Sequence, residues 1–416
     1  MKKLIALFIV FFLSFGNGFA QVEVEVPPPF NIKTISFIQN GENVVPIFRK
    51  GESFTVRFDD LYLTESDYYY TITHCNYDWK PSDLSKNEYI QGMDNIRVQN
   101  YENSINTLQG YSHYWFSLPN SQTQLKVSGN YMLKIFDDSF QLVFSRKFVV
   151  YENTVAVPLQ IKRARNVSDI NYMHNLDFTI KTGDLQLQNP VQNVKVALLQ
   201  NGVWNTAITN IKPQYTIGND LIYKYDKETQ FYASNEYLYL ETKEVRSGNN
   251  TVSRVEFNEI YNTHLYTNKA RANEPYTYYP DINGGFLVNN IGREKPTVEA
   301  DYTWVFFTLS APNYFGKDDI YISGLFNNHA LTDEFKMDYD SKKGLYQKAI
   351  MIKQGFTNYK YVLADKKGNI NQKDAIDGNF YQTENDYYVL VYYKGYNDRY
   401  DRVIGLGKAN SVNIVN

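Results

Sequence analysis

The adjacent residues His74 and Cys75 have the side chains of this sequence best suited to nucleophilic chemistry. Cys75 is the only cysteine, and a nearby histidine is a common base for activating a thiol. Residues 68–75 contain Tyr, Thr and Ile without Gly or Pro, so a strand is expected there. Because successive strand residues point to opposite faces, His74 cannot serve as the base for Cys75. His113 could reach the thiol, but cysteine is often buried, and we expect Cys75 to be an inert core residue.

Metal and cofactor chemistry has little support in the sequence. His74, Cys75 and His113 are the only plausible group of metal ligands, and they lack the short paired spacing of a zinc site. The hydrolase motif G-x-S-x-G, the zinc-protease motif H-E-x-x-H and the phosphate-binding motif G-x-x-x-x-G-K do not occur. Acidic pairs such as Asp59-Asp60 are expected in turns, where carboxylates accept backbone N–H groups. We therefore predict no catalytic residue, no metal and no cofactor.

Residues 1–20 are expected to be a cleaved secretory signal. Lys2 and Lys3 precede a short apolar run, and the small residues Gly18 and Ala20 fit cleavage after Ala20. A membrane-spanning helix is the alternative, but it needs about 20 apolar residues, and this run is shorter. No cysteine follows the run to carry a lipid anchor. The mature chain is therefore expected to be exported.

Composition limits the class of protein. Without Lys2 and Lys3 the formal charge of −3 becomes −5, which is too mild and of the wrong sign for nucleic acid binding. A single cysteine cannot form an intramolecular disulfide, so the fold must depend on packed cores. The 37 Tyr and 26 Phe residues suit strands and half-exposed surfaces. The mature length of roughly 396 residues fits two to four domains.

Short alternating apolar runs recur throughout the mature chain and are separated by Gly, Asn, Asp and Pro. This pattern is typical of an all-β protein. We predict tandem immunoglobulin-like or early-set β-sandwiches: a first domain at residues 28–152, a middle domain at 155–298 and a third domain at 301–416. Residues 131–136 and 142–150 are expected to form a hairpin that resembles the closing strands of an immunoglobulin-like sandwich.

The third domain resembles the early-set sandwich of glycogen-binding modules. The resemblance lies in residues 319–328, with Gly324, Phe326 and Asn327, and continues through residues 337–346 and 354–361. Those modules place a Trp just after the Phe-Asn pair to stack on sugar, whereas Asn328 and His329 follow here. The resemblance therefore implies the fold, and it leaves an exported carbohydrate-binding protein as the alternative function.

The first domain carries a more specific set of motifs. The segment from His74 and Cys75 through Asp78, Trp79, Pro81 and Ser82 is followed in order by residues 88–92, 104–107, 111–114, 118–120, 128–131 and 146–150. Together these motifs resemble the plug protein family of the type IX secretion system, and the ordered match spans residues 32–152. The resemblance implies a periplasmic protein, associated with the inner face of the outer membrane, that closes the periplasmic end of a large translocon barrel without chemistry.

Two groups of residues follow as candidates. The family motifs are expected to be structural, and their residues are His74, Cys75, Asp78, Trp79, Pro81, Ser82, Gly92, His113, Tyr114, Gly129 and Tyr131. Contacts with the barrel protein are expected from aromatic and arginine side chains on two loops, because such side chains contribute much of the binding energy at interfaces. These candidates are Tyr276, Tyr278, Tyr279, Arg97 and Tyr101. An enzyme that uses Cys75 and His113 stays open as a third hypothesis.

Overall fold

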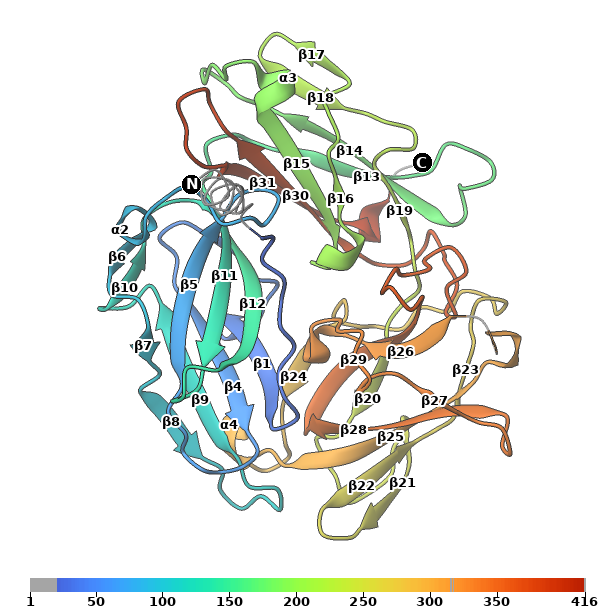
Figure 1. Ribbon diagram of the computed structural model, residues 1–416. Coiled ribbons are helices and arrows are strands. Elements are labelled where there is room, and N and C mark those ends of the chain that lie inside the picture. The colour runs from blue at the N-terminus through green and yellow to red at the C-terminus, as the bar shows by residue number, and fades with distance from the viewer. Residues whose placement is uncertain (1–20, 315, 317, 415–416) are drawn as a thin grey trace, which may run out of the picture.

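The computed structural model describes residues 21–314, 316 and 318–414, so the expected signal at residues 1–20 lies outside the described residues. The chain is almost entirely β, as predicted, and folds into three sandwiches (Figure 1). No helix within the described ranges is long and apolar enough to cross a membrane. The helical segments are single turns: α2 (Lys86–Tyr89), α3 (Pro190–Asn193), α4 (Pro296–Glu299), η1 (Trp204–Thr206), η2 (Pro312–Tyr314), η3 (Leu325–Asn327) and η4 (Ser411–Asn413).

The first sandwich packs two antiparallel-rich sheets around an aromatic core. In the expected hairpin, Tyr131 lies opposite Phe148, and their rings stack with centroids 5.1 Å apart. One sheet has the order β2 (Glu42–Asn43), β1 (Ile32–Gln39), β4 (Phe54–Asp60), β9 (Ser112–Leu118) and β8 (Asn100–Asn103). The other has the order β3 (Ile47–Arg49), β12 (Leu142–Tyr151), β11 (Gly129–Phe136), β5 (Tyr69–Cys75) and β7 (Ile96–Arg97), and β10 (Thr123–Leu125) pairs with β6 (Ile90–Gly92).

The middle sandwich is built from strands that are distant in the sequence. One sheet has the order β13 (Leu159–Arg163), β14 (Met173–Ile180), β18 (Asp220–Tyr223) and β17 (Tyr215–Ile217), with β19 (Gln230–Tyr232) on β14. The other has the order β16 (Ile208–Thr209), β15 (Val194–Gln200), β30 (Asp386–Tyr393) and β31 (Arg402–Asn410). The core between them includes Tyr387, Val389 and Val391 from β30.

The third sandwich takes its long strands from the C-terminal third of the chain. One layer contains β20 (Leu238–Glu241), β29 (Gly355–Ala364) and β24 (Phe286–Val288), with β26 (Asp319–Ser323) on β29. The other layer has the order β21 (Val252–Phe257), β22 (Tyr261–Leu265), β25 (Tyr302–Ser310), β28 (Leu345–Lys353) and β27 (Asp338–Asp340), with β23 (Asn268–Lys269) on β25. Along β25, Val305, Phe307 and Leu309 alternate into the core, as strand geometry requires.

Strand pairing departs from the expected ranges 155–298 and 301–416. β30 and β31 return from the third range to complete the middle sandwich, and Val194 to Gln200 pair with Tyr393 to Tyr387. In the opposite direction, β20 to β24 leave the middle range and join the third sandwich. Alternation of apolar and polar residues indicates that a segment is a strand but does not determine which strand it pairs with. These exchanges could therefore not be predicted from the sequence pattern.

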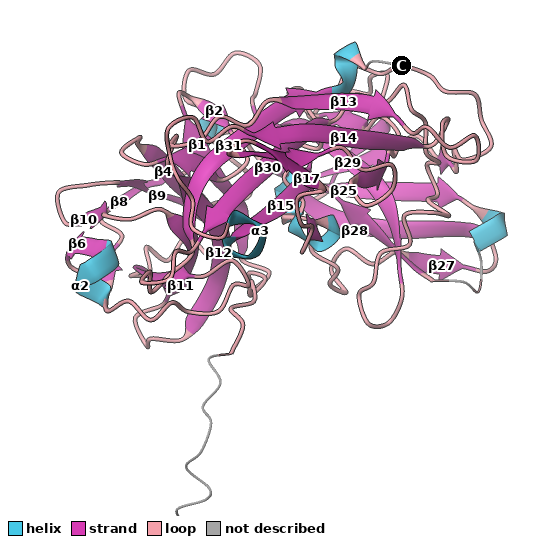
Figure 2. Ribbon diagram, turned by 90° about the horizontal axis from the view of Figure 1, so that it is seen from above, coloured by secondary structure: helices cyan, strands magenta, loops and turns pink. Residues whose placement is uncertain are grey.

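The three sandwiches lie side by side (Figures 1 and 2), and the first shares one buried cluster with the middle sandwich and another with the third. A strap of residues 21–29 runs alongside β12. There the Val26 carbonyl oxygen accepts a hydrogen bond from the Ser145 backbone N–H, and the Val26 N–H donates to the Ser145 hydroxyl. In the strap, Glu25 accepts from the backbone N–H of Lys147 and from the side-chain amide of Asn328, at 2.7 and 3.1 Å. The strap therefore joins the first sandwich to the third.

The discontinuous middle sandwich predicts how fragments behave. A fragment of residues 155–298 lacks β30 and β31, and therefore lacks the core side chains that these two strands contribute. We expect no cooperative unfolding transition of this fragment in urea. A fragment of residues 28–152 is the control, because its own core cluster draws only on residues 32–150. Cooperative unfolding of the 155–298 fragment would contradict the strand exchange.

Candidate functional site

His74 is a buried structural residue at the end of β5. Its Nδ1 lies 2.7 Å from the Ser82 hydroxyl, and its Nε2 lies 3.2 Å from the Ser128 carbonyl oxygen. The imidazole packs edge to face against Tyr131 and Tyr400. Burial lowers the pKa of His74 to about 4, so the ring is neutral at pH 7. Both ring nitrogens are occupied, and neither is free to act as a base.

Gly129 leaves room for that imidazole, and Tyr131 packs against it. A Cβ at Gly129 would lie 2.1 Å from His74 Nε2, and the backbone there has φ of +155°. Tyr131 lies directly opposite His74 on the neighbouring strand. The requirement for glycine and the cross-strand pair show that these motif positions form one packed unit around the ring.

Cys75 and His113 do not form a catalytic pair. Cys75 lies on β5, is 0% exposed, and has its thiol pKa raised to about 12 by burial. His113 lies on β9 in the opposite sheet, where its Nδ1 is 2.6 Å from Asp59 Oδ1. Within residues 21–314, 316 and 318–414 no group of three His, Cys, Asp or Glu side chains is placed to hold a metal ion.

The turn after β5 faces the middle sandwich. Trp79 has φ of +61° and meets Trp204 of η1 edge to face, with ring centroids 5.0 Å apart. The ammonium of Lys147 lies 4.5 Å from the Trp79 ring. Tyr77 donates its hydroxyl to the Val196 carbonyl oxygen at 2.9 Å and its backbone N–H to Asp401 at 3.1 Å. The motif is therefore a contact between sandwiches.

An apolar cluster fills this interface. Cys75 and Met132 point away from the core of the first sandwich, yet both are fully buried because the middle sandwich covers that face. The buried members of the cluster are Cys75, Trp79, Met132, Val149, Ala197, Leu199, Tyr388, Leu390, Tyr392 and Val403. Burial on both faces of the sheet explains why adjacent His74 and Cys75 are equally inaccessible.

The other motif positions also have local structural roles. Asp78 forms an exposed ion pair with Lys80, and Pro81 forms a bridge with Cys75. Tyr114 is buried against Phe58, with ring centroids 5.1 Å apart, and donates its hydroxyl to the Ser66 carbonyl oxygen. The backbone of Gly92 has φ of +106°, and a Cβ there would lie 2.0 Å from the Gln122 carbonyl oxygen.

A second interface, between the first and third sandwiches, contains a buried carboxylate. Asp59 is 0% exposed and ends β4 together with Asp60, so the expected turn position of this pair is wrong. Asp59 Oδ2 accepts hydrogen bonds from Lys353 Nζ and from the Tyr302 hydroxyl, both at 2.6 Å. Burial alone would raise the pKa of Asp59, but Lys353 and His113 hold it below its ordinary value.

Further contacts hold Lys353 and Asp301 at the same interface. Lys353 also donates to the Thr297 carbonyl oxygen at 2.7 Å, and its ammonium lies 4.0 Å from the Tyr111 ring centroid. Asp301 accepts the backbone N–H groups of Leu108 and Gln109 at 2.8 and 3.1 Å. Sequence reasoning missed this network. Its one signal was a lysine, Lys353, that ends an otherwise apolar run.

The five candidate contact residues lie on two different sandwiches. Tyr278 and Tyr279 are 53% and 41% exposed, whereas the hydroxyl of Tyr276 donates to the buried carboxylate of Glu236. Tyr276 therefore anchors its loop. On the first sandwich, Arg97 forms an exposed ion pair with Asp67, and Tyr101 is 40% exposed and donates to Glu65 at 2.9 Å.

The buried ion pair gives a stability prediction. Lys353→Met keeps apolar volume but leaves the Asp59 carboxylate without its ammonium, so we expect a loss of about 3–5 kcal/mol in the free energy of unfolding. Urea unfolding followed by tryptophan fluorescence measures the change. The control is Lys295→Met, which breaks the exposed Lys295–Glu102 pair across the same two sandwiches and should cost at most about 1 kcal/mol. Equal losses in the two variants would refute the role given to Lys353.

Burial of His74 predicts sensitivity to acid. Its pKa in the folded chain, about 4, lies below the unfolded value of about 6.5, so the unfolded chain binds the proton first as the pH falls from 6.5 to 4. Stability should therefore fall over that window, by about 2 kcal/mol between pH 7 and 5 from His74 alone. Urea unfolding of His74→Asn should show a correspondingly smaller loss. An identical loss in both proteins would show that His74 does not titrate as described.

Comparisons with known proteins agree with this architecture. The family model for the type 9 secretion system plug protein 1st domain matches residues 32–152. The crystal structure of a hypothetical protein from Parabacteroides merdae ATCC 43184 is 31% identical, with a TM-score of 0.89 over 94% of this chain and 100% of that chain. No curated protein matches the sequence. The matched range coincides with the first sandwich and its motifs, and residues 32–152 belong to the family of type 9 secretion system plug protein 1st domains.

Proposed function

We propose that the chain is a non-catalytic periplasmic plug that closes the periplasmic end of the large outer-membrane translocon barrel of the type IX secretion system. The family match over residues 32–152 supports a plug role in this system. The observation that carries the proposal is the joining of three sandwiches into one body by buried contacts on two sides of the first sandwich. A plug needs a wide body that keeps its shape under load, and it needs no chemistry.

The two interfaces give the body resistance to bending. At one, an apolar cluster around Cys75 and Trp79 removes side chains of both sandwiches from water. At the other, a displacement of the third sandwich would separate the Asp59 carboxylate from the Lys353 ammonium while both are still shielded from water. This separation costs several kcal/mol. Relative motion of the sandwiches is therefore opposed by both kinds of contact.

The side chains of the first domain also support a non-catalytic role. The imidazole of His74 has both nitrogens occupied, and the thiol of Cys75 is buried with a raised pKa. His113 pairs with Asp59 on the neighbouring strand, in the sheet that does not contain Cys75. These residues hold the sandwich together and contact its neighbours, which is what a body without an active site requires.

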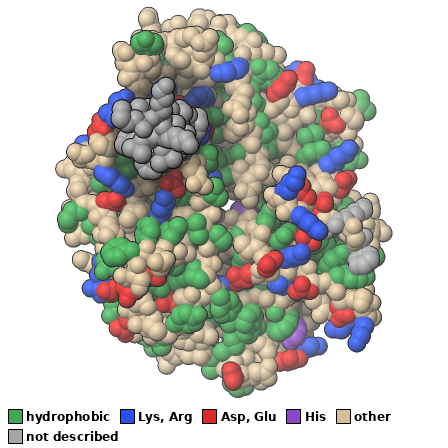
Figure 3. All heavy atoms as spheres, in the orientation of Figure 1, with side chains coloured by type: hydrophobic (Ala, Val, Ile, Leu, Met, Phe, Trp, Pro, Cys, Tyr) green, Lys and Arg blue, Asp and Glu red, His purple; other side chains and the backbone are tan. Residues whose placement is uncertain are grey.

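The surface suits a polar protein–protein contact. Figure 3 shows acidic and basic side chains interspersed over one face, with apolar side chains gathered toward its lower part. Tyr278 and Tyr279 on one sandwich and Arg97 and Tyr101 on another offer the aromatic and guanidinium groups that anchor such interfaces. We assign the barrel protein as the partner and the inner face of the outer membrane as the location.

Export is part of the proposal. The expected signal at residues 1–20 would place cleavage just before the strap of residues 21–29. That strap is bound rather than free, since the Glu23 N–H donates to the Trp79 carbonyl oxygen at 2.8 Å and Glu23 pairs with Lys134 at 2.7 Å. A mature chain that begins at Gln21 would keep all of these contacts.

Co-purification tests the proposal. An affinity-tagged chain should recover the outer-membrane barrel when no secretion substrate is engaged, and recovery should fall when a substrate occupies the barrel, because plug and substrate compete for one opening. Immunoblotting of the barrel in both preparations measures the change. Equal recovery with and without substrate would argue against gating.

A pair of surface variants locates the contact. Tyr278→Ser with Tyr279→Ser should lower recovery of the barrel by roughly tenfold or more, as expected when two exposed aromatic anchors are lost. Tyr396→Ser is the matched control, because Tyr396 is 90% exposed and belongs to the turn between β30 and β31. If recovery is unchanged in the double variant but falls for Arg97→Ala with Tyr101→Ala, the contact lies on the first sandwich instead.

A further inference from the structure

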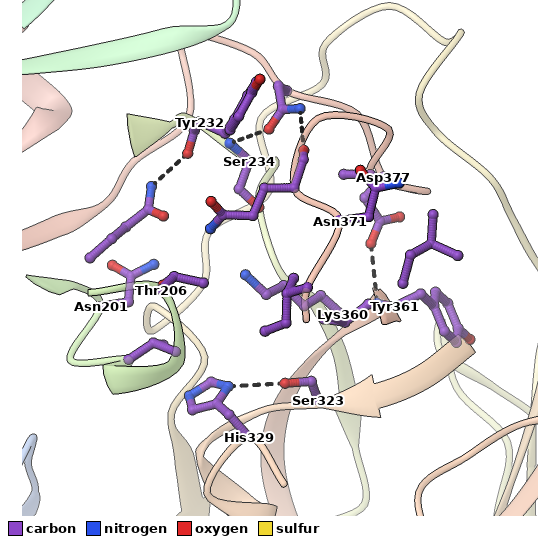
Figure 4. A pocket seen from close by; sticks show the side chains of 18 of the residues that line it. Asn201, Thr206, Tyr232, Ser234, Ser323, His329, Lys360, Tyr361, Asn371 and Asp377 are labelled. Atoms are coloured by element: carbon purple, nitrogen blue, oxygen red, sulfur yellow. Dashed lines mark hydrogen bonds between the residues drawn. The ribbon is translucent and has the colours of Figure 1, made fainter. Parts of the chain in front are cut away.

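A cavity lies between the middle and third sandwiches, away from the family motifs. Its walls come from the connection after β15, the segment around β19, the end of β26, the strand β29 and the connection between β29 and β30. Figure 4 shows Asn201 and Thr206 on one side of this space, Tyr232 and Ser234 above it, and His329 and Lys360 on the side of the third sandwich. The cavity has a volume of about 60 Å³, which is enough for roughly five water molecules.

Most polar groups in the walls are already hydrogen-bonded. The amide of Asn201 bonds with Asn385 and with the Asp386 backbone N–H, each at 2.8 Å. The amide of Asn379 accepts from the Ser234 N–H at 3.0 Å and donates to the Gln372 carbonyl oxygen at 2.9 Å. These bonds fix the shape of the cavity. The polar groups around it that lack a hydrogen bond are therefore the candidates to bind a ligand.

Tyr237 is the clearest of the unbonded groups. Its side chain is 2% exposed and lines the cavity, yet its hydroxyl has no hydrogen-bond partner within the described part of the chain. An orphaned buried hydroxyl is costly, by about 1–3 kcal/mol, and is uncommon in folded proteins. The adjoining backbone at Gly284 leaves space for the ring, because a Cβ there would lie 2.9 Å from the hydroxyl.

Lys360 brings a positive charge that has no direct ion pair among the described residues. Its ammonium lies 5.0 Å from the Tyr237 ring centroid, and among the described residues no carboxylate lies within ion-pair distance of it. The two nearby carboxylates are engaged elsewhere. Asp377 pairs with Arg271 at 2.9 Å, and Asp281 accepts the backbone N–H of Tyr237 at 2.6 Å.

His329 faces the same space from a strained turn. Asn328 and His329 both have left-handed backbones, with φ of +52° and +55°, which side chains other than glycine rarely adopt in succession. The Nδ1 of His329 lies 3.0 Å from the Ser323 hydroxyl. Burial, followed by the charge of Lys360, lowers the pKa of His329 to about 3, so the ring is neutral. When Ser323 donates to Nδ1, the ring proton resides on Nε2 as a further donor.

We propose that this cavity binds a carboxylate group, with Lys360 as the countercharge and His329 Nε2 and the Tyr237 hydroxyl as hydrogen-bond donors. A single cation suits a monoanion better than a phosphate dianion, which draws several positive groups. The small volume fits a carboxylate and a few adjoining atoms. The source of the carboxylate is either a free small acid or the C-terminus of a peptide that enters from the mouth of the cavity.

Isothermal titration calorimetry of the mature full-length chain tests the proposal. The probes are L-lactate, its uncharged analogue lactamide, a short peptide with a free C-terminus and the same peptide amidated. We expect one-to-one binding of lactate, of the free-acid peptide or of both, and at least tenfold weaker binding of the matching amide. Lactate alone identifies a free small acid, and the peptide alone identifies a chain end. No binding of either acid, or equal binding of acid and amide, overturns the proposal.

Variants place the binding in this cavity. Lys360→Gln should lower the affinity at least tenfold, whereas Lys366→Gln, at an exposed lysine of the turn after β29, should leave it unchanged. Tyr237→Phe is a second variant that is expected to fold, because it removes only the orphaned hydroxyl. It should keep or raise the melting temperature of the unliganded chain while weakening binding several-fold. Binding that is unaffected by both Lys360→Gln and Tyr237→Phe would overturn the assignment.

Discussion

The position of the third sandwich on the first depends on one buried carboxylate. Asp59 lies in a strand of the first sandwich and has its charge balanced by Lys353, 294 residues away in the third. A buried charge without a partner costs far more than a misplaced apolar side chain, because the charge loses its hydration and no attraction to an opposite charge offsets the loss. The pair therefore permits one relative orientation. Asp301, which accepts two backbone N–H groups of the first sandwich, restricts the same interface from the other side.

The family motif acts at the opposite interface by a different physical means. There the contact is largely apolar, and the residues after β5 contribute Cys75, Trp79 and Tyr77 to it. The apolar contact stabilises its interface but constrains the relative orientation of the two sandwiches only weakly, whereas the ion pair constrains the relative orientation strongly. Together they make a three-sandwich body from a chain with no disulfide to restrain it. A body of this kind suits a role in which shape, rather than reactivity, does the work.

Much of the fold could be predicted from local sequence pattern. The hairpin of β11 and β12, the strand at β5 and the all-β class follow from alternation and turn residues, because these reflect backbone sterics over a few residues. The partner of β15 could not be predicted, since β30 lies almost 200 residues further on and alternates in the same way as other strands. The candidate site was predicted as a motif, but its contacts with the middle sandwich were not.

The sequence alone established that His74 cannot act on Cys75, because strand geometry separates adjacent side chains wherever the strand is placed. It also identified the family through motifs that follow one another in order. Only the tertiary structure decided that both faces of β5 are buried, that Asp59 meets Lys353, and that Tyr237, His329 and Lys360 surround one cavity. Local pattern depends on neighbours along the chain, whereas these contacts depend on which surfaces gain most by leaving water together.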